Sequence, residues 1–519
     1  MSNTSKRTGL IVLSMALGLL MASLDNTIVS ASMNKVIENI GGFEKVSWVF
    51  TAYMLASTST MLIFGKLSDL FGRKRFYLIG IGLFLLGSAL CGTAQTVDQL
   101  IWFRVIQGIG SGSVFPISFS IIFTLFADPK QAAKLSGVMG AVFGLSSVAG
   151  PQLGTLISEH MSWRWCFYVN VPIGLASMFV LIFSLRESKA ERKPKIDYAG
   201  AVLLVAATVS ALMALELGGK DYAWDSWQIV GLFALGALAA ALFIGVERRA
   251  EEPMLPLTIF KNRLVLGISL LCFCQGVIMF SAIAYLPIYA TAVLGKTNSN
   301  GILTPMMASL ICGAIVSGFF IARFRFRTVL FANMALGVAA AILLMNLTPS
   351  MAYWQVIGIM ILLGLGVIGP LMSLGQTAVA MSVAPKYIGI SSSVVGFWRN
   401  IGGVIGASVM AVLVNASLKD SSREAIAKFS IPPDRAGKLA NPESVIKGAA
   451  GMPADLLAFM RGEIGGAISH GFILSLLVMI AGAVIALTVG GAKYRKPNAE
   501  GGSGEPQLAG SPTSASHPA

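Results

Sequence analysis

Long apolar stretches separated by short polar ones make up most of the chain. A helix needs about 20 apolar residues to cross a hydrocarbon core of about 30 Å, and these stretches have that length. The pattern predicts about fourteen membrane-spanning helices near residues 10–33, 47–65, 76–96, 99–122, 134–157, 167–185, 198–217, 228–246, 264–291, 302–322, 327–347, 353–375, 387–414 and 468–490.

The composition supports a polytopic all-α membrane protein. Hydrophobic residues make up 55% of the 519 residues and charged residues only 12%, whereas soluble domains carry about a quarter charged residues. The first apolar stretch is too long for the core of a signal peptide and contains Asp25, so we interpret it as a retained helix.

The sequence contains no motif of a known catalytic centre. It has no HExxH pair, no phosphate-binding Walker loop and no nucleophile elbow, and its five cysteines lack metal-ligand spacing. We therefore expect neither an enzyme nor an ATP-driven pump, with no cofactor, no metal and no disulfide. A gradient is left as the source of energy, and a proton is the expected coupling ion.

Basic residues gather in every second connection between the predicted helices. One set includes Arg73 to Arg75 and the stretch from Arg186 to Lys195, whereas the other short connections hold only Lys35, Lys45, Arg164, Lys220 and Lys296. Cytoplasmic loops carry the excess of Lys and Arg, so both termini are predicted on the cytoplasmic side. The formal net charge of +14 thus belongs to loops, and we expect no nucleic-acid partner.

Two charged residues lie inside predicted helices at the same estimated depth. A charge at the centre of a span costs about 2.5–3.5 kcal/mol on insertion scales, so each needs a physical reason. At 1.5 Å per residue, Asp25 lies about 22 Å along the first helix and Arg104 about 7–8 Å from the opposite side along the fourth, which places both in one layer. Two interpretations follow. One is a structural salt bridge, and the other, which we prefer, is a proton-coupling site of Asp25 and Arg104 in a water-accessible cavity.

The connection between the second and third helices reads Gly65-Lys-Leu-Ser-Asp69-Leu-Phe-Gly72-Arg73-Lys-Arg75. Taken alone, it is a tight turn with an acid and a basic cluster, as any cytoplasmic loop could carry. The arrangement resembles the signature loop of the major facilitator superfamily. That resemblance implies a conformational gate of Gly65, Asp69, Gly72, Arg73 and Arg75, in which Asp69 and Arg73 form a charge network that stabilises one conformation.

Further motifs resemble the fourteen-helix EmrB/QacA family of drug:proton antiporters within that superfamily. Leu24-Asp25-Asn26-Thr27-Ile28-Val29 resembles its first-helix hallmark, although Ser30-Ala31-Ser32-Met33 replaces the usual Asn-Val-Ala-Leu-Pro. Gly150-Pro151-x-x-Gly154 resembles the motif associated with antiporters, with Thr155 in place of the second glycine. The segment 163–174 also matches the family pattern.

Five residues are predicted to bind substrate: Asp25, Asn26, Gln107, Trp398 and Arg399. Arg399 lies near mid-membrane in the thirteenth helix with no acid in the same half, which argues against exclusively cationic substrates. Glu216, near the outer end of the 198–217 helix, is interpreted as an interfacial acid rather than a second proton site.

The resemblance implies the major facilitator fold, with two six-helix bundles and two inserted central helices. We predict a cytoplasmic N-terminus (1–9), an N-terminal bundle (10–186), the two additional helices with their connectors (187–263), a C-terminal bundle (264–492) that includes an external loop (415–467), and a disordered cytoplasmic tail (493–519).

The predicted function is proton-coupled efflux of multiple lipophilic drugs, cationic ones among them, by alternating access. The expected protein is a monomer of the bacterial cytoplasmic membrane in contact with membrane lipid, and an envelope adaptor protein is left open as a partner. Two alternatives are an exporter of an endogenous lipid, metabolite or siderophore, and a non-transporting membrane sensor or scaffold.

Overall fold

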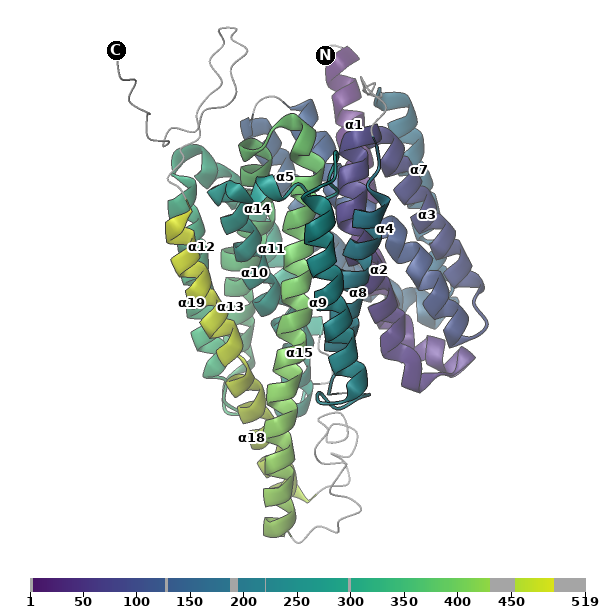
Figure 1. The fold of residues 1–519 in the computed structure, drawn as a ribbon. Coiled ribbons are helices and arrows are strands. Elements are labelled where there is room, and N and C mark those ends of the chain that lie inside the picture. The colour runs from purple at the N-terminus through teal and green to yellow at the C-terminus, as the bar shows by residue number, and fades with distance from the viewer. Residues whose placement is uncertain are drawn as a thin grey trace, which may run out of the picture.

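The computed structural model describes residues 3–126, 129–186, 195–219, 221–296, 300–429 and 453–489. Over these residues fourteen helical segments are long and apolar enough to cross a membrane, and their bounds agree with the predicted spans to within several residues in most cases. The helix α1 begins and α19 ends at the same end of the molecule (Figure 1).

Over the described residues, the N-terminal bundle and the inserted pair comprise nine α-helices, two of which, α6 and α7, share one span. They are α1 (Asn3–Ile40), α2 (Val46–Phe71), α3 (Arg73–Thr93), α4 (Val97–Leu125), α5 (Pro129–His160), α6 (Trp165–Tyr168), α7 (Asn170–Ser184), α8 (Tyr198–Leu217) and α9 (Trp227–Glu247), with the short η1 (Phe43–Lys45) before α2.

In the part of the C-terminal bundle that the structure describes there are six spans, three of which are interrupted or distorted. Its elements are η2 (Leu257–Lys261), α10 (Arg263–Ile288), the π-helical η3 (Tyr289–Val293), α11 (Asn300–Arg323), α12 (Phe326–Met345), α13 (Tyr353–Leu363), the π-helical η4 (Gly364–Ile368), α14 (Gly369–Ser382), η5 (Pro385–Tyr387), α15 (Ile388–Phe429), α18 (Ala454–Gly471) and α19 (Ile473–Thr488).

The helical bounds differ from the predicted segments at two places. Helix α1 begins at Asn3, so most of the predicted 1–9 segment is helical. The predicted loop 415–467 is much shorter, because α15 continues to Phe429 and α18 begins at Ala454. Both helices extend beyond the rest of the bundle (Figure 1). The predicted tail 493–519 lies outside the described residues.

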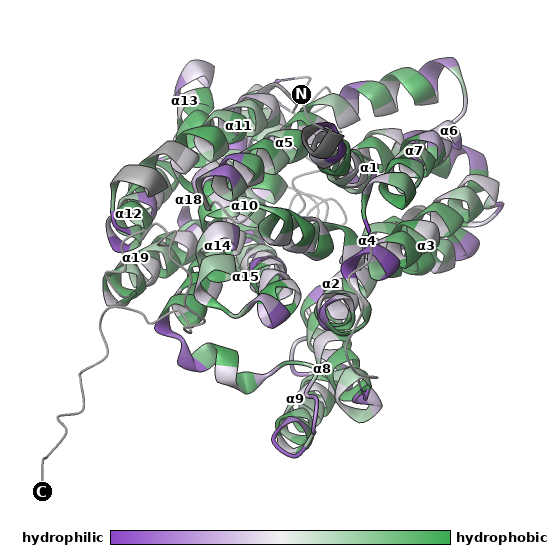
Figure 2. Cartoon of the chain, turned by 90° about the horizontal axis from the view of Figure 1, so that it is seen from above, coloured by the Kyte–Doolittle hydropathy of each residue, from purple (hydrophilic) through white to green (hydrophobic). Residues whose placement is uncertain are grey.

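The outer surface of the bundles is apolar, as a lipid-facing surface must be. Phe183, Trp227 and Trp354 are each at least 70% exposed, and the outward faces of the helices are predominantly hydrophobic (Figure 2). The inserted pair α8–α9 lies at the edge of the molecule beside α2 (Figure 2).

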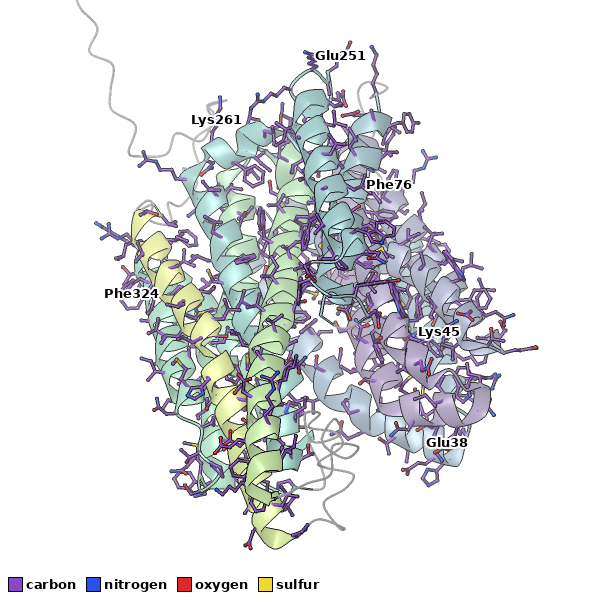
Figure 3. All side chains as sticks on the ribbon, turned by 60° about the horizontal axis from the view of Figure 1, so that its bottom comes forward. Glu38, Lys45, Phe76, Glu251, Lys261 and Phe324 are labelled. Atoms are coloured by element: carbon purple, nitrogen blue, oxygen red, sulfur yellow. The ribbon has the colours of Figure 1, made fainter. Side chains whose placement is uncertain are left out.

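Two ends of the molecule are distinguished by their loops. We call the end that carries the α2–α3 connection, the 248–262 connector and η5 the basic face, and the opposite end, which carries η1 and the turn 218–226, the far face. Glu251 and Lys261 lie at the basic face, whereas Glu38 and Lys45 lie toward the far face (Figure 3).

Candidate functional site

A buried polar network surrounds Asp25 in the N-terminal bundle. Arg104 of α4 forms an ion pair with Asp25 through Nη1, and both side chains have no exposed surface. The two other donors to the carboxylate are the Nδ2 of Asn170 at 2.8 Å and the Nε2 of Gln107 at 2.7 Å, and both donate to Oδ1. The pair therefore lies in one layer, as the depths estimated from the sequence suggest.

The guanidinium of Arg104 is also held on its remaining sides. It donates from Nη1 to the Oε1 of Gln107 at 2.9 Å, from Nη2 to the Oδ1 of Asn26 at 3.2 Å, and from Nε to the carbonyl of Val49 at 3.2 Å. Its carbon Cζ lies 4.0 Å from the ring centroid of Tyr53 on α2. A buried ion pair is stable only when such additional hydrogen bonds satisfy both partners, and this pair meets that condition.

The water-accessible cavity that we predicted around this pair is not open in this conformation. Asp25, Arg104 and Gln107 each have 0% exposure, so neither charge reaches solvent. A pair this well satisfied also fits the structural salt bridge, the interpretation that we did not prefer. Only a change in the packing of α1, α4 and α7 would admit water to the carboxylate.

Helix α5 crosses α1 directly beside this network. A Cβ atom on Gly150 would lie 2.6 Å from the Cβ of Thr27, and one on Gly154 would lie 2.5 Å from the carbonyl oxygen of Ile28. These contacts leave no space for a side chain at either glycine. Pro151 lies inside α5 between them. The motif thus sets the distance between α5 and the part of α1 that follows Asp25.

The α2–α3 connection forms a clamp on the other bundle at the basic face. Asp69, whose side chain is 1% exposed, accepts hydrogen bonds from the backbone amides of Gly389 at 3.0 Å and Ile390 at 2.9 Å, at the beginning of α15. The free amides at a helix N-terminus carry partial positive charge, so the carboxylate stabilises this contact. We call the contact of Asp69 and Arg73 with the start of α15 the basic-face clamp.

Arg73 completes the clamp by joining the two bundles. Its Nη2 donates to Asp69 at 3.1 Å and to the carbonyl of Pro385 at 2.9 Å, and its Nη1 donates to Thr124 of α4. Gly72 adopts φ = +108°, which favours glycine, and allows α3 to begin directly after α2.

Two further residues predicted for the gate differ in their positions. A Cβ on Gly65 would clash with Ser393 and would lie 2.8 Å from the carbonyl of Gly389, so Gly65 permits the close crossing of α2 and α15. Arg75 lies in the first turn of α3 and is exposed.

The five residues predicted to bind substrate form two separate groups. Asp25, Asn26 and Gln107 belong to the buried network. Arg399 instead lies over the ring of Phe115, 4.7 Å from its centroid, and Phe115 is eleven residues, about 16 Å, along α4 from Arg104.

The second group lies at a contact between the bundles. Trp398 packs edge-on against Phe273 of α10 at 6.2 Å between ring centroids. Arg399 of α15 is 7% exposed and packs against Phe115 of α4 in the opposite bundle. The neighbouring Asn400 donates to the hydroxyl of Thr58 on α2 at 3.1 Å.

Sequence reasoning did not single out Asn170 and Tyr53 as members of the network. Both are neutral polar residues in apolar stretches, where they do not stand out as charges do. Asn170 lies within the 163–174 segment that resembles the family pattern, and that resemblance was the only available signal.

The comparisons with known proteins agree with this architecture. The family model described as Major Facilitator Superfamily matches residues 15–407. The chain is 39% identical to "Multidrug resistance protein 3" of Bacillus subtilis over 94% of this chain and 96% of that protein. It is 37% identical to "Multidrug transporter protein MdtP" of the same organism, over 79% of this chain and 76% of that protein.

One further relative and two solved structures are also similar to this chain. The "Rubrofusarin-specific efflux pump aurT" of Gibberella zeae is 32% identical over 79% of this chain and 77% of that protein. The fold is similar to those of the human organic anion transporter MFSD10 and the proton:xylose symporter XylE, each with a TM-score of 0.57. The identities to these structures are 14% and 13%. The matches cover 92% of this chain in both cases, with 100% of MFSD10 and 96% of XylE.

The family model covers about three quarters of the sequence, and the relatives align over most of their own length. The fourteen spans and the similarity to solved transporters give the same fold. The chain therefore belongs to the major facilitator superfamily.

Proposed function

We propose that this chain exports several kinds of lipophilic small molecule and couples that export to proton uptake, as a drug:proton antiporter of the cytoplasmic membrane. The names of the relatives support the first part, since two of them are called a multidrug resistance protein and a multidrug transporter. The proposed working unit is a monomer, and its only co-substrate is H⁺.

The observation that carries the proton coupling is the buried pair of Asp25 and Arg104. A proton on Asp25 would remove the negative charge and leave Arg104 buried without a counter-ion. Breaking a buried pair by removing one partner costs several kcal/mol, so the helices around it would rearrange. The carboxylate can therefore link protonation to a change in the packing of α1, α4 and α5.

The positions of the contacts between bundles suggest which part of the cycle this conformation represents. The basic-face clamp joins α2 to α15, and on the same side Gly137 and Gly144 of α5 pack closely on α11. With the basic face assigned to the cytoplasm from the distribution of Lys and Arg, the transporter is closed toward the cytoplasm.

In the proposed cycle, protonation of Asp25 from outside releases the bound compound and weakens the pairing with Arg104. Loss of the proton toward the cytoplasm restores the pair and the ability to bind the next compound, and closure of the basic face, the conformation described above with the pair intact, follows that step. Alternating access between the two faces then exchanges one compound for protons.

The test is the variant Asp25→Asn in everted membrane vesicles. We expect this variant to reach the membrane but to lose pH-gradient-driven transport of ethidium, because the Asn side chain cannot bind and release a proton as the carboxylate does. Glu38→Gln, at an exposed acid of the same helix that pairs with Lys35, is the control and should transport as the native protein does. Native transport rates in Asp25→Asn would exclude Asp25 from the coupling.

A single endogenous compound is the second candidate substrate, and the aurT relative, which is named as specific for one compound, favours it. A panel of dyes and antibiotics, assayed with and without a protonophore, separates the two. Gradient-dependent export of several unrelated compounds supports the multidrug assignment, whereas export of none of them together with accumulation of one metabolite in a deletion strain supports the alternative.

A further inference from the structure

Arg399 of α15 is a second buried arginine within the spans, and unlike Arg104 it has no counter-ion. Among the described residues no carboxylate forms an ion pair with it, and the ionisable side chain that interacts with it is the thiol of Cys272. A charge inside a membrane-spanning segment is costly, and such residues usually face a substrate or ion pathway. The charge of Arg399 is therefore available to a ligand.

The N–H donors of the Arg399 guanidinium are also unused. Arg104 donates to side chains and a backbone carbonyl of its network, whereas Arg399 has no hydrogen-bond acceptor in the part of the chain that the structure describes. Its contact is with the ring of Phe115, whose centroid lies 4.7 Å from Cζ. A ring face attracts the positive charge without accepting a directed hydrogen bond from each N–H, so the planar fork of donors can still bind a carboxylate through two hydrogen bonds.

The backbone at Arg399 is held rigidly against α10. A Cβ on Gly276 would overlap the carbonyl oxygen of Arg399, so the two helices cross here without space for a side chain. The arginine side chain extends to the other bundle, where it meets Phe115 of α4. A binding group on a fixed helix backbone loses little conformational entropy when a ligand binds.

The N-terminal bundle contributes an apolar wall beside Arg399. A Cβ on Gly396, one turn earlier on α15, would lie 2.8 Å from the Sδ of Met61 on α2 and 3.9 Å from the ring of Phe115. Met61 is flexible and Phe115 is flat, and both suit the lipophilic body of a ligand. The wall and the charge come from different bundles, so their separation changes when the bundles move.

Arg399 lies between the basic-face clamp and a pocket on the far-face side. The clamp holds Ile390, nine residues and thus about 14 Å before Arg399 on α15. Gly403, one turn after Arg399, is among the residues that line a pocket of about 540 Å³ between α10, α15 and the inserted pair. A compound that crosses the molecule between the bundles would therefore pass the guanidinium.

We propose that Arg399 binds the carboxylate of transported amphiphilic acids, while the lipophilic body of the compound lies against Met61 and Phe115. The inference rests on the proposed export function and deepens it, because it assigns the residue that distinguishes an acid from its ester. The compound supplies the counter-ion that the chain itself lacks. The proton and the substrate carboxylate are then held in different bundles, since this site shares no residue with the network around Asp25.

The experiment measures equilibrium binding of two dyes to the purified full-length protein, by fluorescence at neutral pH. One is a rhodamine with a free carboxylate, and the other is its methyl ester, which has the same aromatic body without the negative charge. Arg399→Gln should raise the Kd of the carboxylate dye at least tenfold, because charge-assisted hydrogen bonds are lost. The Kd of the ester should stay within about twofold of the native value.

Two further variants test which property of the side chain matters. Arg399→Lys keeps the positive charge but not the planar fork, so its Kd for the carboxylate dye should lie between those of the native protein and Arg399→Gln. Lys45→Gln removes an exposed positive charge that pairs with Asp98 toward the far face, and it should bind both dyes as the native protein does.

Thermal unfolding separates a binding role of Arg399 from a structural one. The Tm of Arg399→Gln should be no lower than that of the native protein, because the variant removes a buried charge that has no counter-ion. Native affinity of Arg399→Gln for the carboxylate dye would overturn the proposal. An equal loss of both dyes together with a lower Tm would also overturn it, since a structural residue has that effect.

The outcome also separates this site from the coupling mechanism. Selective loss of the carboxylate dye in Arg399→Gln together with full gradient-driven transport in Asp25→Asn would leave the Arg399 site valid and refute the role of Asp25. Native binding of the carboxylate dye in Arg399→Gln together with inactive Asp25→Asn would refute the Arg399 site alone.

Discussion

The charged pair at the centre of the N-terminal bundle could be predicted from the sequence, whereas its neutral hydrogen-bond partners could not. Asp25 and Arg104 stand out because a charge within an apolar span is costly and rare. Hydroxyl and amide side chains do not, because they are common in apolar spans and many hydroxyl groups bond only to their own helix, as that of Ser113 does to the carbonyl of Gly110. Asn170 is one of the exceptions, and only the folded chain brings it to Asp25.

Removal of the Asn170 donor should weaken the proposed coupling without abolishing it. A hydrogen bond to a charged group contributes about 1.5–3 kcal/mol, so Asn170→Ala should reduce gradient-driven ethidium efflux about tenfold. Ser88→Ala removes the other acceptor of the Asn170 amide but no partner of Asp25, and it should reduce efflux much less. Equal effects of the two variants would argue against a specific role for the bond to Asp25.

At the scale of elements, the sequence predicts helices where they cross lipid but not where they continue into water. Hydropathy ended the thirteenth helix near residue 414, because charged residues follow it. In the structure α15 continues, since charges are compatible with a solvated helix and Asp420 pairs with Arg423 one turn away. Helix α18 also packs on this extension, and Ser421 donates to Glu463 at 2.5 Å. Such a tertiary contact is not visible in a single-sequence pattern.

The crossing of α1 and α5 gives a prediction for one element pair. Gly154→Ala would place a methyl group 2.5 Å from the carbonyl oxygen of Ile28, and backbone atoms cannot yield as a flexible side chain can. We expect a destabilisation of about 1–3 kcal/mol, seen as a lower Tm, together with reduced efflux. Gly82→Ala in α3 is the matched control, because no neighbouring atom lies within 4 Å of its added Cβ. An unchanged Tm for Gly154→Ala would mean that the crossing is looser than the structure indicates.

At the scale of the whole molecule, the superfamily fold was predictable because its signature motifs are local in sequence. The tertiary contacts that those motifs make could not be predicted in the same way. The carboxylate of Asp69 binds the start of α15 more than 300 residues away, and no spacing rule connects the two segments. The clamp therefore became evident only from the folded chain.

Loss of the clamp should shift the molecule toward the conformation open at the basic face. Asp69→Asn removes the charge that pairs with Arg73 and faces the N-terminus of α15. A Ser393→Cys reporter, buried against Gly65, should then react with a maleimide at least several-fold faster in a protein whose exposed Cys312 has been replaced by serine.

The control for this measurement is Asp98→Asn. That variant removes an exposed acid that pairs with Lys45 toward the far face, and it should leave the labelling rate unchanged. A rate in Asp69→Asn equal to that in Asp98→Asn would show that the clamp does not hold the basic face closed.

The length of α15 makes it a lever arm for the bundle to which it belongs. Its 42 residues extend about 63 Å, twice the thickness of the hydrocarbon core, so the end near Asp420 stands well clear of the lipid. A rigid rotation of about 10° around the level of Arg399 would sweep Asp420, about 32 Å along the helix, through about 5–6 Å. A spin label at Asp420, paired with one at Glu44, would thus magnify a small tilt inside the bilayer into a distance change measurable in water.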